Sequence, residues 1–305
     1  LAELSAPIAP PAKDGSSHTR SSTLPAIREN EALAALERVA PLPTVAQKIL
    51  GLVDSVTASA KDIEQVVRLD PVIAAKLIKL VNSPFYGLTH QVASVAEAVS
   101  MIGFSGVKSL VLAASVSEVL AQDCSGYGYG ERGLWKSAIA GAAIARTVAQ
   151  HAGVANEECE EYFMGALMRD IGVLALAPFL ITRGQRLVRD READVQARER
   201  VALGFDHCWA GERLGERWRI PVRLRLCLAK HHRSIGVPAA DVRLVAGVRL
   251  ADCLTSASRI GLLADHPFDV RVDPAQIQAA GLDLARFQAL IKHLPAVIQA
   301  AEMQL

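Results

Sequence analysis

The chain has 305 residues, with 33 Lys or Arg against 32 Asp or Glu, so its formal net charge at pH 7 is only +1. This length allows one large lobed domain or two modest ones. A nearly neutral chain has no strong field to hold it on a nucleic-acid backbone or an anionic membrane, and we expect neither as a partner.

The five cysteines are scattered, odd in number and contain no CxxC pair, which favours small buried thiols in a reducing cytoplasm. They are Cys124, Cys159, Cys208, Cys227 and Cys253. The most apolar stretch, Val173 to Ile181, contains Pro178 and has roughly half of the ~20 residues that a spanning helix needs. The sequence therefore predicts a cytoplasmic protein without a membrane span.

Residues 1–28 mix Ala, Pro and Ser with few large apolar side chains, a composition typical of a flexible linker or tail. From Glu31 onward, helix start and stop signals recur, and almost no stretch alternates with period two. The fold class predicted for the rest of the chain is therefore all-α.

The clearest helix signal covers residues 70–81, where Asp70 can cap the helix and Pro71 suits its first turn. Residues 59–62 and 94–97 both match the capping-box pattern, and Gly103 is suited to end a helix. These signals predict about five short helices between residues 31 and 122.

Three glycines within residues 123–130 interrupt the helical pattern, and we interpret this segment as a flexible hinge between two lobes. The densely charged region 183–200 is typical of a solvated helix face. Further helices are predicted at 134–150, 156–169, 206–217, 221–232 and 241–257, with two or three closing helices between residues 273 and 304.

Metal ligation needs neutral imidazoles and carboxylates that lie close together. The second half of the chain offers such groups at four places, namely Asp170, His207, the pair His231-His232, and Asp252. Taken separately, each is more typical of a helix cap, a hydrogen-bonded core group or a surface residue. Spacing alone does not establish a site.

A series of motifs runs through the chain in a fixed order. In the first half they are Leu42-Pro43-Thr44-Val45-Ala46, Asp70-Pro71, Asn82-Ser83-Pro84-Phe85-Tyr86-Gly87, Ser94-Val95-Ala96-Glu97-Ala98 and Ile102-Gly103. In the second half they are Leu134-Trp135-Lys136-Ser137, Gly165-Ala166-Leu167-Met168-Arg169-Asp170-Ile171-Gly172, Asp206-His207 and His231-His232. Together, over about residues 33 to 255, they closely resemble the HDOD (HD-related output domain) family.

The resemblance implies a two-lobed helical fold related to the HD phosphohydrolases. It places an HDOD domain at 29–260, with an N-terminal helical lobe at 29–125, an HD-like lobe at 131–260 and closing helices at 261–305. Members of this family are regarded as bacterial signalling modules, often near cyclic-dinucleotide or two-component systems. The implied partners are signalling proteins of such pathways.

In catalytic HD relatives, a first His, a His-Asp pair, further His residues and a final Asp bind divalent metals that activate water. Here the first His position is Ser137, and the His of the pair is Arg169, whose guanidinium has no lone pair to give. The matching positions that remain are Asp170, His207, His231, His232 and Asp252. We therefore expect a degenerate site with no metal and no cofactor, in which Arg169 pairs with Asp170.

The leading hypothesis is a non-catalytic signalling module that acts through protein contacts. One alternative is a metal-dependent phosphohydrolase or cyclic-dinucleotide phosphodiesterase of the HD class, which the replacements at Ser137 and Arg169 oppose. Another is an effector that binds a nucleotide without hydrolysis through a basic stretch. The candidate contacts for an anionic ligand or acidic partner in that stretch are Arg217, Arg219, Arg223, Lys230 and Arg233.

Overall fold

The computed structural model describes residues 26–53, 55, 58–187, 195–233, 235–263 and 272–302. Within these ranges the secondary structure is helical and contains no strand, apart from one isolated bridge between Tyr129 and Leu262. The predicted all-α class is confirmed. Most of the expected tail, residues 1–25, lies outside the described residues, but Ile27 is buried and its backbone N–H donates to the carbonyl of Leu203 at 3.0 Å.

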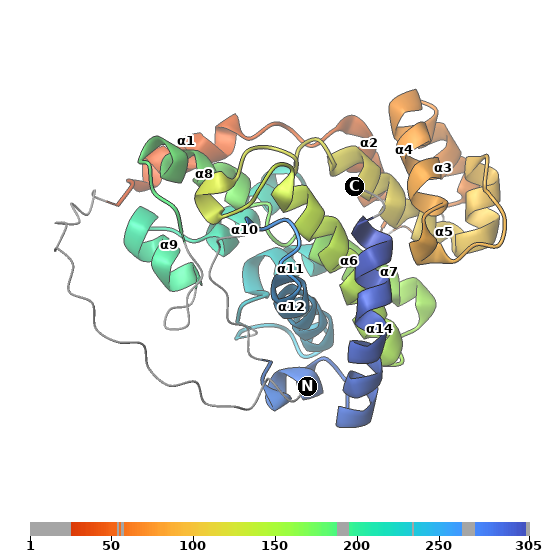
Figure 1. The fold of residues 1–305 in the computed structure, drawn as a ribbon. Helices are drawn as coiled ribbons and strands as arrows, with labels where there is room; N and C mark the ends of the chain where they lie inside the picture. Colours follow the sequence, from red (N-terminus) through yellow and green to blue (C-terminus); the bar gives the residue numbers. More distant parts are fainter. Residues whose placement is uncertain are drawn as a thin grey trace.

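The helices follow one another along the whole described chain (Figure 1). In the first half they are α1 (Glu29–Arg38), α2 (Thr44–Gly51), α3 (Ala60–Val67), α4 (Pro71–Val81), η1 (Pro84–Tyr86), α5 (Val95–Val116) and η2 (Ser125–Tyr127). In the second half they are α6 (Gly133–His151), α7 (Asn156–Met168), α8 (Val173–Thr182), α9 (Val195–Leu203), α10 (His207–Arg217), α11 (Val222–Lys230), α12 (Val242–Ala257), α13 (Pro274–Ala279) and α14 (Leu284–Glu302).

Local capping explains where several of these helices begin. The Asp70 carboxylate accepts backbone N–H groups of Val72 and Ile73 at 2.9 and 3.2 Å, so it satisfies donors that the first turn of α4 cannot pair internally. Gly103 has φ 77° and ψ 168°, which breaks α5 into two helical segments. Both features follow the sequence signals closely.

The division into lobes differs from the expectation in one respect. Helices α2 to α5 pack together as the first lobe, but α1 contacts α8 and α10 of the second lobe (Figure 1). The reason is the buried face of α1, formed by Ala32, Ala35 and Leu36, together with the Arg217 guanidinium, which donates to the Leu36 carbonyl. At the other end of the chain, α14 packs against α6 and η1.

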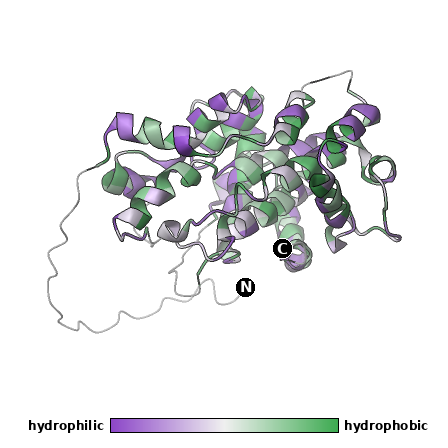
Figure 2. Cartoon of the chain, turned by 90° about the horizontal axis from the view of Figure 1, so that it is seen from above, coloured by the Kyte–Doolittle hydropathy of each residue, from purple (hydrophilic) through white to green (hydrophobic). Residues whose placement is uncertain are grey.

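Apolar side chains from both lobes form one continuous core, and the helix faces turned away from it are more polar (Figure 2). By length and composition, the stretches Val95–Val116 and Asn156–Thr182 could cross a membrane, but 61% and 83% of their apolar windows are buried in the protein. Such burial is typical of core helices in soluble proteins, so these stretches are weak evidence for a membrane segment.

The glycine-rich segment 123–130 is packed into the structure, in contrast to the expected flexible hinge. Tyr127 and Tyr129 are 8% and 6% exposed, and a Cβ placed on Gly126 would lie 2.7 Å from the Cβ of Leu180. The glycines here permit close contact with α8, and the two tyrosines anchor the segment in the core.

A second glycine, Gly172, sets the distance between two elements of the second lobe. A Cβ at this position would overlap with the backbone carbonyl of His207 and lie 2.6 Å from the backbone nitrogen of Gly211. Only glycine lets the start of α8 approach the first turn of α10 this closely. The contact therefore fixes His207 relative to the preceding Asp170.

We expect Gly172→Ala to lower the free energy of unfolding by about 3 kcal/mol, because the methyl group would force α8 and α10 apart. Gly51→Ala is the matched control, since a Cβ there would contact nothing within 4 Å and alanine favours a helix. Urea denaturation of both variants measures the difference. Equal stabilities would contradict the close packing inferred at Gly172.

Candidate functional site

The side chains that the sequence singled out at the HD positions come together in the second lobe. Each lies at or near a helix end except those on α6 and α12, which project from the middle of their helices. They are Ser137 from α6, Arg169 and Asp170 from the turn after α7, His207 from the first turn of α10, His231 and His232 from the end of α11, and Asp252 from α12.

Arg169 lies at the centre of one half of this site and is only 1% exposed. Its Nε atom is 3.0 Å from Oδ2 of Asp170 and 3.1 Å from Oδ1 of Asp252. Its Nη1 donates to the Ala166 carbonyl at 2.8 Å, and its Nη2 donates to the Ser137 hydroxyl at 3.3 Å. The expected pair of Arg169 with Asp170 is present, and Asp252 completes it as a second carboxylate partner.

Helix α6 provides the space that the guanidinium needs. Ser137 and Gly141 are one helical turn apart, so both face Arg169. A Cβ on Gly141 would overlap with Nη1 of Arg169, which shows that a small residue is required here. An imidazole at position 137 and a guanidinium at position 169 would compete for the same volume. The serine and the glycine together form a cradle for arginine.

This half of the site does not fit the divalent metal that HD relatives hold. The Arg169 guanidinium lies against both carboxylates that would have to coordinate the ion, and it offers only donors. A divalent ion about 4 Å from the guanidinium charge would be repelled by roughly 8 kcal/mol at an effective dielectric of about 20. The arginine replaces the cation at this position.

Burial alone would raise the pKa of the Asp170 carboxyl, but the Arg169 guanidinium and a hydrogen bond from His231 hold that pKa well below its usual range. Asp170 therefore stays ionised although it is 5% exposed. Its second oxygen, Oδ1, faces Nε2 of His231 at 3.5 Å and Nε2 of His207 at 3.6 Å. Asp170 thus connects the arginine to a cluster of histidines.

The histidine cluster is oriented by acceptors behind the rings. Nδ1 of His207 is 2.8 Å from both carboxylate oxygens of Glu199, and Nδ1 of His231 is 2.8 Å from the carbonyl oxygen of Cys227. Because these oxygens accept, each Nδ1 carries the hydrogen and each Nε2 points inward. Glu199 is completely buried, so the expected solvated face of region 183–200 fails at this residue, while residues 188–194 lie outside the described ranges.

The inward atoms of this cluster have the spacing of metal ligands. Nε2 of His207 lies 3.3 Å from Nε2 of His231, 3.0 Å from Nε2 of His232 and 3.7 Å from Sγ of Cys208. Tetrahedral zinc with ordinary bond lengths places nitrogen ligands about 3.4 Å apart, and sulfur about 3.6 Å from nitrogen. The four residues His207, Cys208, His231 and His232 bring ligand atoms within 4.8 Å of one another, so they could hold a metal ion after a small adjustment of the side chains.

Charges around the cluster favour a positive occupant. Burial by itself would lower the pKa of both buried histidines, yet Glu199 raises the pKa of His207 well above its usual range, and Cys208 and Asp170 raise that of His231 to about 10. Burial would raise the pKa of the Cys208 thiol, but the two imidazolium groups lower it to about 7. The site requires positive charge, in the form of protons or of a bound cation.

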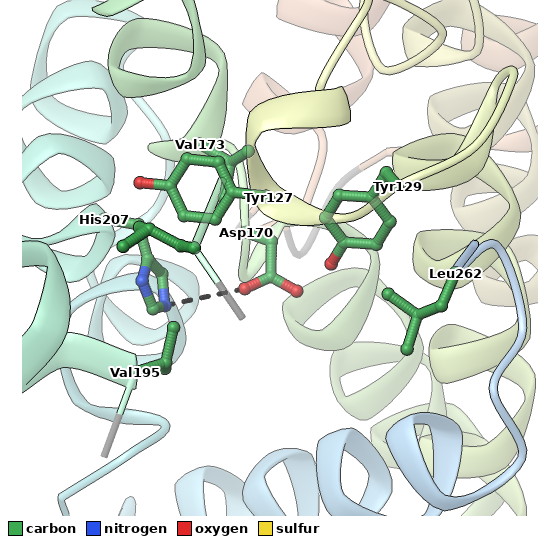
Figure 3. A pocket seen from close by; sticks show the side chains of 8 residues that line it. Tyr127, Tyr129, Asp170, Val173, Val195, His207 and Leu262 are labelled. Atoms are coloured by element: carbon green, nitrogen blue, oxygen red, sulfur yellow. Dashed lines mark ion pairs between the residues drawn. The ribbon is translucent and has the colours of Figure 1, made fainter. Parts of the chain in front are cut away.

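The cavity beside Asp170 and His207 is nearly filled. Its lining includes Tyr127 on the His207 side of Asp170 and Tyr129 and Leu262 on the other side, and a dashed line in Figure 3 marks the Asp170–His207 pair. Among the described residues its volume is about 10 Å³, which is roughly the space for one water molecule. An organic substrate requires several hundred Å³.

Part of the basic stretch is used inside the protein. Arg217 donates to backbone carbonyls of α1, and Arg223 pairs with Glu161 at 2.6 Å and with Asp241 at 2.8 Å. These contacts offset two of the five charges that were expected to meet an anionic ligand or partner. A contact role for Arg219, Lys230 and Arg233 stays a prediction.

A family model described as HDOD domain matches residues 39–234. The chain belongs to the HDOD domain family. An uncharacterized protein of Treponema pallidum (strain Nichols) is 21% identical over 222 residues, which represent 71% of this chain and 42% of that protein. The HDOD chain thus matches less than half the length of this relative.

Solved structures share the fold. An HDOD domain protein of unknown function from Geobacter sulfurreducens superposes with a TM-score of 0.70 at 20% identity, covering 90% of this chain and 97% of that one. A protein from Shewanella amazonensis SB2B, named as a candidate phosphohydrolase, has a TM-score of 0.65 at 20% identity, with 90% and 98% covered. A candidate signal transduction protein from Marinobacter aquaeolei VT8 has a TM-score of 0.67 at 21% identity, with 90% and 65% covered.

Two residues of the site escaped the sequence analysis. Glu199 lies in a charged segment whose composition resembles a solvated helix, and only the folded chain buries it against His207. Cys208 directly follows His207, so the sequence signal for a ligand role was this adjacent His-Cys pair. Its ligand-like position depends on His231, which is 23 residues away in the sequence.

Replacing Arg169 by Met should destabilise the fold by about 3–5 kcal/mol, because Asp170 and Asp252 would be left as buried, unpaired charges. Arg68→Met is the control, since Arg68 is 81% exposed and its pair with Glu64 spans 3.9 Å. Chemical denaturation measures both variants. Adding Asp170→Asn and Asp252→Asn to Arg169→Met should recover part of the loss, and no recovery would contradict the charge argument.

Proposed function

We propose that this HDOD protein is a non-catalytic cytoplasmic signalling module that acts through protein contacts. The observation that carries the proposal is Arg169, which is buried between Asp170 and Asp252 where an HD enzyme would hold a metal ion. With the arginine in place, neither carboxylate is available to coordinate a cation there. The module keeps the HD scaffold, and the residues at the former ligand positions stabilise the fold instead of binding a metal ion.

Two further observations support this function. The cavity next to Asp170 has room for about one water molecule and none for a phosphodiester, so substrate could not approach the former metal position. A structure with the same fold is named a candidate signal transduction protein. The rival function, an HD-class phosphohydrolase, is supported by the names given to other structures of this fold.

Purified wild-type protein supplied with Mn²⁺ or Mg²⁺ should show no turnover of cyclic dinucleotides or of bis(p-nitrophenyl) phosphate. Hydrolysis at either substrate that disappears in Asp170→Ala would refute the non-catalytic assignment. Affinity capture with a crosslinker from the source cells tests the second part of the proposal. Recovery of the same protein partner in repeated captures with the wild-type chain is expected, and recovery of no specific partner would contradict this part of the proposal.

The double variant Ser137→His, Arg169→His restores the two ligands that the sequence lacks. We expect it to bind Mn²⁺ more tightly than wild type, because the guanidinium charge is gone and two imidazoles join Asp170 and Asp252. Ser137→His alone is the control and should gain nothing, since Arg169 still fills the position. Calorimetric titration measures the affinity. Equal affinities for the double variant and the control would contradict the role assigned to Arg169.

A second candidate function is a structural metal centre that joins α10 to α11. The observation in its favour is the tetrad His207, Cys208, His231 and His232, whose ligand atoms lie within 4.8 Å of one another. Glu199 and the Cys227 carbonyl orient two of the rings from behind, as outer groups do in metal sites. With four protein ligands such a centre would be closed, as structural zinc sites are, and it is compatible with the absence of catalysis.

Protein purified without chelator should contain close to one equivalent of zinc by elemental analysis if the tetrad is a metal centre. Cys208→Ser with His232→Ala should abolish this content and lower Tm, whereas Cys253→Ser, which lies outside the tetrad, should change neither. Chelator should lower Tm of wild type only. If the purified protein contains no metal and its Tm does not change when chelator is added, the cluster carries protons and is not a metal centre.

A further inference from the structure

A larger cavity lies between the two lobes, away from the HD positions. We define this inter-lobe cavity by its walls, which are η1, the middle of α5, the end of α6 and the start of α7. Its volume is about 530 Å³, within the range of sites that hold small organic ligands. Its charged and aromatic lining residues are Phe85, Tyr86, Phe104, Arg146, Glu157 and Glu160.

Two buried polar atoms in its wall have no hydrogen-bond partner within the described structure, namely the Tyr86 hydroxyl and Oε2 of Glu160. Glu160 is only 3% exposed, and its other oxygen, Oε1, accepts from Nε of Arg146 at 2.7 Å. Burial and the nearby Glu160 raise the pKa of Tyr86 far above its usual range, so its hydroxyl remains a donor. Unpaired polar atoms in a core cost stability and call for an explanation.

The aromatic part of the wall is arranged around a cation. The Arg146 guanidinium lies 5.5 Å from the ring centre of Phe85 and 5.4 Å from that of Tyr86, and these rings meet edge to face at 5.0 Å. Arg146 is thereby fixed by both Glu160 and the rings. A planar guanidinium and aromatic rings are surfaces on which planar, π-bonded ligands stack.

The polar groups define which planar ligand fits. Oε2 of Glu160 can only accept, and the Tyr86 hydroxyl can donate, so the complement is an N–H donor beside an acceptor. The Watson–Crick edge of a nucleobase has this pair, since adenine and cytosine offer an amino group beside a ring nitrogen and guanine offers N1–H beside O6. Among the bases, a purine has the larger ring surface for stacking on Arg146 and the aromatic rings. Glu157 and Glu160 outweigh the single charge of Arg146, which disfavours anionic groups as the primary contact.

We propose that the inter-lobe cavity binds a purine base, with Glu160 and Tyr86 contacting its hydrogen-bonding edge and Arg146 lying along its plane. Both atoms are buried although their residues line the cavity, so contact with a ligand requires the Tyr86 and Glu160 side chains to shift. The break of α5 at Gly103 leaves backbone N–H groups of the next turn beside the cavity as donors for ring nitrogens. None of these residues belongs to the Arg169 site, so the inference stands independently of the proposed function.

Calorimetric titration of the full chain with adenosine, guanosine and their 5′-monophosphates, and with cytidine as a control ligand, tests the assignment. We expect saturable binding of a purine compound in a 1:1 ratio and weaker binding of cytidine, whose base has a similar hydrogen-bonding edge but a smaller ring for stacking. A nucleoside that binds as well as its monophosphate identifies the base as the recognised group. Absence of saturable purine binding, or equal binding of cytidine, overturns the proposal.

The decisive variant is Tyr86→Phe, which removes an unpartnered hydroxyl and keeps the ring. It should weaken purine binding by about 5- to 10-fold, while Tm of the ligand-free protein stays the same or rises. Tyr162→Phe on α7, a buried tyrosine outside the cavity, should leave the affinity unchanged. If Tyr86→Phe raises Tm without altering the dissociation constant, the hydroxyl does not contact the ligand and the proposal fails.

Discussion

The pairing of Arg169 with Asp170 and Asp252 is the interaction on which the second lobe depends. All three groups are at least 95% buried, so each would carry a large desolvation cost alone. The geometry offsets this cost because the guanidinium also donates to Ser137 and to the Ala166 carbonyl. Removing the arginine alone would leave two buried carboxylates without a partner, which is more destabilising than replacing all three charged groups by apolar ones.

The same charges account for the histidine cluster. Asp170, Asp252 and Glu199 are acidic groups in one buried region, and Arg169 pairs with Asp170 and Asp252. Against the effect of burial, Glu199 and Asp170 raise the pKa of His207 and His231, which favours protonated rings or a bound cation there. The arginine in one half of the site and the positively charged histidine cluster in the other thus compensate the same group of buried acidic side chains.

The features that the sequence predicted correctly are those that depend on local interactions. The Asp70 cap and the Gly103 break depend on residues within one turn, and both lie where the pattern placed them. The pairing of Arg169 followed from the family resemblance, which supplied the neighbours that spacing could not. Glu199 could not be found this way, because a charged helix is expected to be solvated and only the fold packs His207, eight residues later, against it. The packing of the segment at Tyr127 was missed because Gly126 contacts Leu180, which is distant in the sequence.

Helix α7 connects the two regions that the proposals concern. Glu160, in the wall of the inter-lobe cavity, and Arg169, directly after the helix, are nine residues apart, which is about 13 Å along an α-helix. α7 is buried along most of its length against α6, α11 and α12, and close packing of this kind transmits strain along a helix. A ligand that displaces Glu160 would therefore act on the element that positions Arg169, so the former metal position is placed to register events in the cavity between the lobes.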